Sequence, residues 1–350
     1  MNDRLISLAI LALVALASAC SSSGAPGGRR ASGETGTVVY PPAPATPVVE
    51  WIGAIATRAD VDNRKRTLKK VLVGAEEQEP SLVAPTAVAI GADGTIYAVD
   101  QHFRGVLIIN RDQRRFDLFR GSSPGSLFEP VGVAVADDGT LYVSDATTQA
   151  VYAYDAELRF ETAYGGAGVF GRPTGIALNS DGSRIAVCDT ARHAVDVLDA
   201  ASGETLFTIG GREHSPREGE FNFPVAVAFD AEGYLYVSDY LNFRIQVFDA
   251  AGDLDLVFGK AGDRPGDMNR PRGLAADAAN GVLYQVDGAF QLVQMFNLDG
   301  EVLMWFGEPG SGPGQFSLPS GIALRDGLLV VADTLNHRLQ LFRFLGSPQE

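Results

Sequence analysis

The stretch DYLNFRIQVFD, Asp239 to Asp249, contains the pattern that decides the fold. It reads as the end of one strand, a tight polar connection with Asn242 and Arg244, and a second strand in which Ile245 and Val247 alternate with polar residues. Related segments recur every 43 to 51 residues along the chain. Periods of this length are typical of solenoids, propellers and other repeat arrays. The stretch is therefore interpreted as one of six structural units.

Each unit has the same order of signals. A Pro begins it, with an apolar residue three positions earlier and a small residue two positions later. A short apolar strand follows, and then a turn of the Asp-Gly, Glu-Gly or Asn-Gly type, in which glycine supplies the positive φ that tight hairpins require. A second strand, of the form LYVSD, ends in an Asp. The prolines are Pro85, Pro130, Pro173, Pro224, Pro271 and Pro319, and the carboxylates are Asp100, Asp145, Asp189, Asp239, Asp287 and Asp333.

Six units of about four strands each, with no helix between them, predict an all-β, six-bladed β-propeller, because each meander must stack on its neighbours to bury its faces. The small residue after each Pro fits a position where six inner strands converge. A linear array is the alternative. The sixth unit lacks an outer strand, and Lys69 to Gly74 is an orphan strand that we expect to close the ring from the N-terminal side. Val48 to Ile55 is expected to be a further strand against the rim.

The N-terminus predicts export and a lipid anchor. Arg4 precedes an apolar run, Leu5 to Ala17, which is too short to span a bilayer but suits a signal peptide over residues 1–19. The run ends in LASAC, which resembles the lipobox of bacterial lipoproteins and implies acylation of Cys20. An ordinary signal peptide is the alternative. The Ser/Gly/Pro-rich residues 20–47 are expected to form a tether to a folded domain over residues 48–350.

The patterns FxxPxGIA, DGxLYVSD and NxRIQVFD, repeated from about residue 82 to 345, resemble the six-bladed propellers built from NHL repeats. Together with Cys20, they make the chain similar to bacterial lipoproteins that carry this domain. The resemblance implies a palmitate-bearing membrane anchor in the cell envelope. Where the cell has two membranes, Ser21 after the Cys implies a place at the outer membrane or in the periplasm, and the side of the membrane that the domain faces stays open. The fold hosts binding modules and a few enzymes, so it leaves activity open.

Charge and cysteine content restrict the possible partners. The chain has 350 residues, a formal net charge of -15 and a pI of about 4.7. Such a field disfavours nucleic acid and anionic membrane surfaces as partners. Cys188, the second of two cysteines, lies in an apolar strand segment and is interpreted as a buried spectator thiol.

The residues that could bind a metal or a cofactor are each interpreted as parts of the repeat structure. An Asp that ends a strand in every unit is expected to accept hydrogen bonds from turn amides rather than to bind a metal. His193 and His337 share one slot of the repeat with Phe243 and are interpreted as repeat residues, while His102 is displaced by one or two places. The inner strands are apolar, so metal catalysis would depend on loops alone. No metal site and no cofactor are predicted.

The connections before the innermost strands and those between the second and third strands are expected on one face, around the channel mouth. Cationic and aromatic residues there suit an acidic or aromatic partner, and ordinary solvation of loop arginines is the alternative. The predicted binding face comprises His102, Arg104, Arg172, Arg192, His193, Tyr240, Arg270, Arg272, Phe290 and His337.

The sequence therefore predicts a monomeric, lipid-anchored propeller that binds an envelope protein, or a glycan, without catalysis. A metal-assisted lyase or lactonase acting at the channel mouth is the first alternative. A structural subunit of an envelope or electron-transfer assembly is the second.

Overall fold

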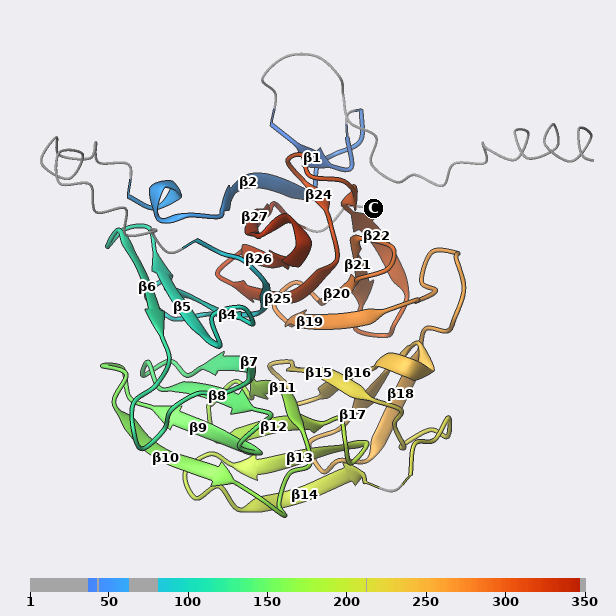
Figure 1. Ribbon diagram of the computed structural model, residues 1–350. Coiled ribbons are helices and arrows are strands. Elements are labelled where there is room, and N and C mark those ends of the chain that lie inside the picture. The colour runs from blue at the N-terminus through green and yellow to red at the C-terminus, as the bar shows by residue number, and fades with distance from the viewer. Residues whose placement is uncertain (1–36, 43, 63–80, 212, 347–350) are drawn as a thin grey trace, which may run out of the picture.

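The computed structural model describes residues 37–42, 44–62, 81–211 and 213–346. Six antiparallel sheets stand around a central axis, which confirms the six-bladed β-propeller (Figure 1). The predicted signal peptide, Cys20 and the orphan segment Lys69 to Gly74 lie outside the described residues.

The first five blades have four strands each, in meander order from the axis outward. Blade 1 contains β3 (Pro85–Ile90), β4 (Ile96–Asp100), β5 (Gly105–Asn110) and β6 (Arg115–Phe119). Blade 2 contains β7 (Pro130–Val135), β8 (Leu141–Asp145), β9 (Ala150–Tyr154) and β10 (Phe160–Gly165). Blade 3 contains β11 (Pro173–Leu178), β12 (Arg184–Asp189), β13 (Ala194–Asp199) and β14 (Thr205–Gly210). Blade 4 contains β15 (Pro224–Phe229), β16 (Leu235–Asp239), β17 (Arg244–Phe248) and β18 (Leu254–Phe258). Blade 5 contains β19 (Pro271–Asp277), β20 (Val282–Asp287), β21 (Leu292–Asn297) and β22 (Val302–Phe306).

Blade 6 is assembled from both ends of the described chain. Its strands from the axis outward are β25 (Pro319–Arg325), β26 (Leu328–Asp333), β27 (Arg338–Phe344), β2 (Val49–Ile55) and β1 (Val39–Tyr40). A short parallel pair, β23 (Glu308–Pro309) and β24 (Gln315–Phe316), precedes β25. Three single turns of 3-10 helix complete the described structure: η1 (Arg58–Asp60), η2 (Tyr240–Asn242) and η3 (Thr334–Asn336).

Neighbouring inner strands approach so closely that the second residue after each Pro must be small. A Cβ on Gly132 would lie 2.2 Å from the carbonyl oxygen of Thr174. One on Gly321 would lie 2.7 Å from the carbonyl oxygen of Thr86, so the same contact joins the last blade to the first. Real Cβ atoms do not approach backbone so closely, because packed interiors leave no room for the overlap. The predicted role of the small residue is confirmed.

Apolar side chains fill the wedges between blades. Leu107 of blade 1 packs in one buried cluster with Val330 of blade 6, and Tyr284 of blade 5 packs with Phe342 of blade 6 in another. Each blade thus buries both of its faces against its neighbours. This mutual burial is the main driving force that holds the ring together.

The ring is closed by β2, which pairs antiparallel with β27 from Val49 opposite Phe344 to Ile55 opposite Leu339. Lys69 to Gly74 was the sequence-based candidate for this edge, and the structure corrects that assignment. β2 occupies the edge of β27 and buries Val49 and Ile55 there, and β1, two residues of the predicted tether, pairs with its far edge.

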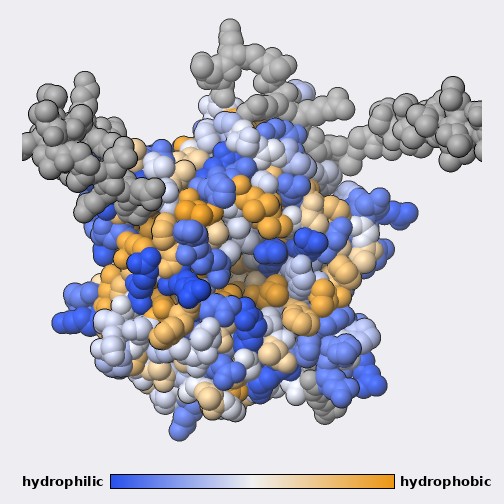
Figure 2. Space-filling view, in the orientation of Figure 1, coloured by the Kyte–Doolittle hydropathy of each residue, from blue (hydrophilic) through white to orange (hydrophobic). Residues whose placement is uncertain are grey.

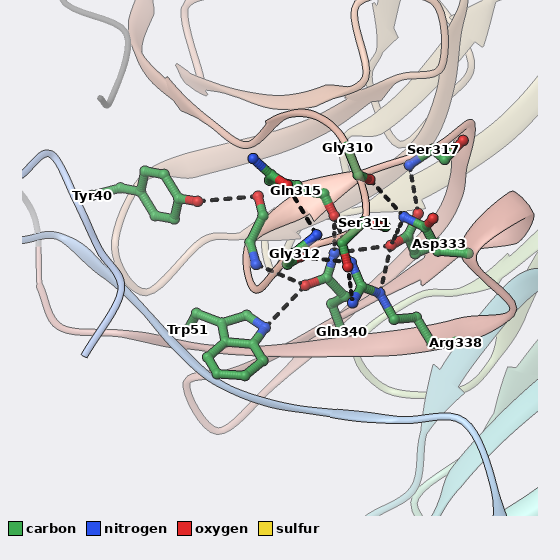
Figure 3. Close-up of polar contacts among 12 residues, drawn as sticks. Tyr40, Trp51, Gly310, Ser311, Gly312, Gln315, Ser317, Asp333, Arg338 and Gln340 are labelled. Carbon is green, nitrogen blue, oxygen red and sulfur yellow. Dashed lines mark hydrogen bonds and ion pairs between the residues drawn. The ribbon is translucent and has the colours of Figure 1, made fainter. Parts of the chain in front are cut away.

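A polar network fixes the closing strand (Figure 3). The buried side chain of Gln340 accepts hydrogen bonds from Trp51 Nε1 at 2.9 Å and from the Gly314 amide at 3.0 Å. It donates to the carbonyl of Gln315 at 2.6 Å and to Asp333 at 3.0 Å. One amide side chain therefore connects the N-terminal strand, the loop before β25 and the end of β26.

The stretch Asp239 to Asp249 makes the same kind of contacts in blade 4. Arg244 donates to Asp239 at 2.9 Å and to backbone carbonyls of the loop before β15, including that of Glu220 at 3.0 Å. Gln246 donates to the same Glu220 carbonyl at 2.8 Å. The Asn-x-Arg-x-Gln pattern of blades 4 and 6 is therefore a clamp that holds the long loop before the inner strand against its own blade.

Replacement of Gly132 by Ala should destabilise the protein by about 3 kcal/mol, because the added Cβ meets the backbone of blade 3. Gly182→Ala is the matched control: it has open space but a φ of +71°, so it should cost only about 1 kcal/mol. Chemical denaturation measures both values. Equal losses would contradict the close-approach argument.

Gln340→Ala and Gln246→Ala should each cost about 3 kcal/mol, because each removes a buried side chain that makes hydrogen bonds on both sides. Gln340 accepts from the Gly314 amide and donates to buried Asp333, and Gln246 accepts from the Gly219 amide and donates to buried Asp239. Only the Gln340 variant also loses the hydrogen bond from Trp51 Nε1. Hydrogen exchange should therefore become faster in Val49–Ile55 in that variant alone. Unchanged exchange in this strand would show that Gln340 does not secure the closure.

Candidate functional site

A cavity of ≈ 480 Å³ lies on the propeller axis. Every residue that directly follows a repeat Pro lines it, and the small residues behind them form the next layer along the inner strands. A third layer is apolar and consists of Val88, Val133, Ile176, Val227, Leu274 and Ile322. The residues that follow the prolines are Thr86, Val131, Thr174, Val225, Arg272 and Ser320. The cavity is thus polar and cationic where the inner strands begin and apolar further along them.

Loop side chains extend the wall at the end of the ring where the inner strands begin. Gln101 and Tyr240 follow strand-ending Asp residues, and Arg172 and Phe223 immediately precede repeat prolines. Figure 2 shows apolar residues in orange beside hydrophilic residues in blue around the middle of the face turned to the viewer.

The predicted binding-face residues lie at this end of the ring. The second strand of each blade runs antiparallel to the inner strand, so the loop that follows its final Asp lies beside the start of the inner strand. Only Arg172, Tyr240 and Arg272 line the cavity. The others lie outside its wall: His102, Arg104, Arg270 and His337 are exposed, and Arg192, His193 and Phe290 are half-buried.

Several of these residues link one blade to the next. His193 and His337 occupy a left-handed position of the repeat, with φ of 52° and 55°. Nδ1 of His193 accepts a hydrogen bond from the Phe223 amide at 3.2 Å, and Nδ1 of His337 is hydrogen-bonded to the carbonyl of Val83. Gln149 in the same slot donates to the carbonyl of Gly171. The two histidines therefore have structural contacts, as their interpretation as repeat residues implies.

The strand-ending carboxylates bind turn amides, as predicted. Asp145, for example, accepts from the amides of Phe128 at 2.6 Å and Glu129 at 2.8 Å. All six are fully buried, and burial raises the pKa of Asp239 above its usual range although Arg244 opposes the effect. The described residues contain no group of three His, Cys, Asp or Glu side chains arranged to hold a metal ion.

Cys188 is fully buried in β12, and burial raises the pKa of its thiol well above the usual value. The thiol is therefore held in its protonated, unreactive form.

The arginines at the mouth differ in their pairing. Arg172 pairs with Glu129 at 2.7 Å, and Arg192 pairs with Asp196 at 2.8 Å. In the described part of the chain, the guanidinium of Arg272 makes no hydrogen bond or ion pair, and its Nε is buried without an acceptor. Thr86 Oγ1, in the same cavity, is also buried without a partner. An unsatisfied buried polar group costs about 1–3 kcal/mol, so these two groups require an explanation.

Sequence reasoning missed Gln101 and Phe223, and also the hydroxyl-bearing residues Thr86, Thr174 and Ser320. The repeat register carried the necessary signal. Since every residue after a repeat Pro lines the cavity, the six positions could have been read from the aligned units.

The fold and the central cavity together define a six-bladed β-propeller with an axial cavity. The family model of the NHL repeat matches residues 316–342, which lie in the last blade. The search for similar curated proteins finds no match.

Solved propeller structures resemble the chain. A protein of unknown function from Bacteroides thetaiotaomicron is 17% identical with a TM-score of 0.63, over 85% of this chain and 75% of that one. Virginiamycin B lyase from Staphylococcus aureus is 14% identical with a TM-score of 0.56, over 75% of this chain and 96% of that one. A gluconolactonase from Xanthomonas campestris is 18% identical with a TM-score of 0.57, over 84% of this chain and 98% of that one. At these identities the similarity establishes the fold alone.

Within the described ranges, no helix has the length and apolar character that crossing a membrane requires.

His193 should titrate below its ordinary pKa of 6.5, because burial and the nearby ring of His214, at a centroid distance of 5.8 Å, both disfavour its charged form. The stability that neutral His193 contributes is full above the unfolded pKa and is lost as the pH falls through the lower folded pKa. NMR titration measures the midpoint, and His214→Ala should raise it. A midpoint of 6.5 or higher would contradict the assigned contact with the Phe223 amide.

Proposed function

We propose that the protein is a non-catalytic binding platform, and that its partner, an envelope protein or a glycan-bearing molecule, docks at the mouth of the central channel. The composition of the cavity wall carries this proposal. The wall offers two cations, hydroxyl groups, an aromatic pair and an apolar interior, and none of the described lining residues is His, Cys, Asp or Glu. Such a wall suits binding better than proton transfer or nucleophilic attack at neutral pH.

The rigidity of the ring supports the same role. Clamps such as that of Gln246 hold the loops, and contacts such as that of His193 hold adjacent blades together at the mouth. A surface that is ordered before binding loses little conformational freedom when a partner docks, so more of the contact energy appears as affinity.

Placement at the cell envelope follows from the resemblance of the N-terminus to a lipoprotein signal. Cys20 would carry the lipid, and residues 20–47 would link this anchor to a monomeric propeller in the periplasm or at the outer membrane. The net charge of -15 favours such a partner over nucleic acid.

A metal-assisted lyase or lactonase is the second candidate. Its support is the lyase and the lactonase that share the fold, and fold alone does not carry an activity. A structural role in an envelope or electron-transfer assembly would use the same surface without a separate ligand. Metal content and turnover of the purified chain distinguish the enzyme from both.

The full chain should capture a specific partner from native envelope extract, and Phe223→Ala with Tyr240→Ala should abolish the capture. Loss of one aromatic anchor costs about 2 kcal/mol, so affinity for the purified partner should fall at least tenfold for each substitution. Calorimetry measures this change.

Tyr234→Ala is the matched control, because Tyr234 is an aromatic residue 36% exposed at the other end of blade 4. Capture should be unchanged in this variant. No enriched partner, or equal capture by the Phe223 and Tyr240 variant, would count against the proposal.

A further inference from the structure

We propose that the central cavity binds a ligand group in which a single carboxylate is attached to an apolar body, and that Arg272 holds the carboxylate. The proposal rests on the binding function above and names the chemistry that the same cavity recognises.

Arg272 is a charged side chain without a partner of opposite charge among the described residues. The chain has 43 acidic residues against 28 basic ones, and Arg172 and Arg192 at the mouth and the clamp arginines Arg244 and Arg338 are paired with carboxylates. Arg104 and Arg270, also at the mouth, are exposed to solvent. Arg272 has no carboxylate partner among the described residues, although its Nε is buried. A guanidinium is charged at every physiological pH and matches a carboxylate with parallel hydrogen bonds. A bound carboxylate would supply the acceptor that the protein does not.

The fold makes room for the side chain of Arg272 beside Gly288. Gly288 follows the strand-ending Asp287, at the position held in blades 1 and 4 by Gln101 and Tyr240. A Cβ on Gly288 would lie 3.0 Å from Nε and 3.1 Å from Cδ of Arg272. The backbone of Gly288 is not in the left-handed region, so its conformation does not require glycine. The missing side chain instead leaves the space that Arg272 occupies.

Hydroxyl groups line the cavity wall beside Arg272. Ser320 and Thr86 hold the equivalent position in the next two blades around the ring. Ser320 Oγ donates to the carbonyl of Thr86 at 3.0 Å and contacts Thr334 Oγ1 at 2.8 Å, while Thr86 Oγ1 is buried and unpaired. A hydroxyl can donate to an anion as readily as it accepts. Both unsatisfied groups of the cavity therefore lie on one arc of its wall.

The remaining walls select the ligand. One unpaired cation balances one negative charge, and the acidic chain as a whole disfavours a multiply charged anion. The apolar layer, with Ile176 and Leu274 among its members, and the aromatic ring of Phe223 suit an apolar body next to the carboxylate. The carboxylate can belong to a free acid or to the C-terminus of a partner chain.

Calorimetry on the purified full chain tests the proposal with four probes: 3-phenylpropanoate, its amide, the peptide Ala-Ala-Phe and the C-terminal amide of that peptide. At least one acid should bind, and the corresponding amide should bind at least tenfold more weakly. Arg272→Gln should remove this preference, whereas Arg111→Gln, an exposed arginine in the turn after β5, should leave it intact. Arg272→Lys should retain part of it, because the charge remains and the planar fork is lost.

Binding of the peptide acid alone assigns the site to chain termini, and binding of both acids assigns it to free acids as well. No binding at millimolar concentration, equal binding of acid and amide, or an unchanged preference in Arg272→Gln would overturn the proposal, provided that thermal melting shows the variant folded. Gly288→Ala, which crowds Arg272 without removing its charge, should also lower the affinity for the acids. If neither acid binds while capture of the partner still depends on Phe223, the carboxylate proposal is wrong and the platform proposal stands. If an acid binds and no partner is captured, the platform proposal is wrong and the carboxylate proposal stands.

Discussion

The buried Asp at the end of the second strand of every blade is the constraint on which the rest of the structure depends. Each carboxylate takes amide hydrogen bonds from the residues that lead into its own inner strand, as Asp100 does with Val83 and Ala84. The bonds fix where the inner strand begins and therefore where its first side chains stand around the axis. A buried carboxylate is tolerated only when it accepts hydrogen bonds. Here the donors are backbone amides, which themselves need an acceptor. The channel mouth is a consequence of this arrangement repeated around the ring.

Closure of the ring adds a second constraint. A propeller blade is held by its neighbours, so an open seam would expose a strand edge and the apolar faces on both sides of it. The seam is sealed by three kinds of contact: strand pairing of β2 with β27, the hydrogen bonds of Gln340, and the approach of Gly321 to the backbone of blade 1. The phenol of Tyr40 reinforces it by donating to the carbonyl of Gly314. This rigidity allows a cavity to persist at the axis.

The cavity differs from the repeat that builds it. Most positions of the wall obey the repeat, because every blade contributes a small residue and then an apolar residue from the strand that its Pro begins. Arg272 and Gly288 break it together in blade 5, one by adding a long cation and the other by removing a side chain. A symmetric scaffold acquires specificity where one blade departs from the repeat on a surface to which all blades contribute. Function depends on such particular side chains rather than on the fold.

The architecture could be predicted from the sequence, because the period, the turn glycines and the strand-ending carboxylates are local signals that repeat six times. The sequence also placed the cationic and aromatic loops at one end of the ring. It did not decide which strand closes the ring, since β2 meets β27 across nearly three hundred positions of chain and several short apolar segments could have taken that edge. Nor could it decide which arginines are free. Arg172 is neutralised by Glu129, 43 residues away, while Arg272 makes no ion pair with a described carboxylate. Ion pairing depends on distances of a few ångströms in three dimensions, and only the tertiary structure sets those distances.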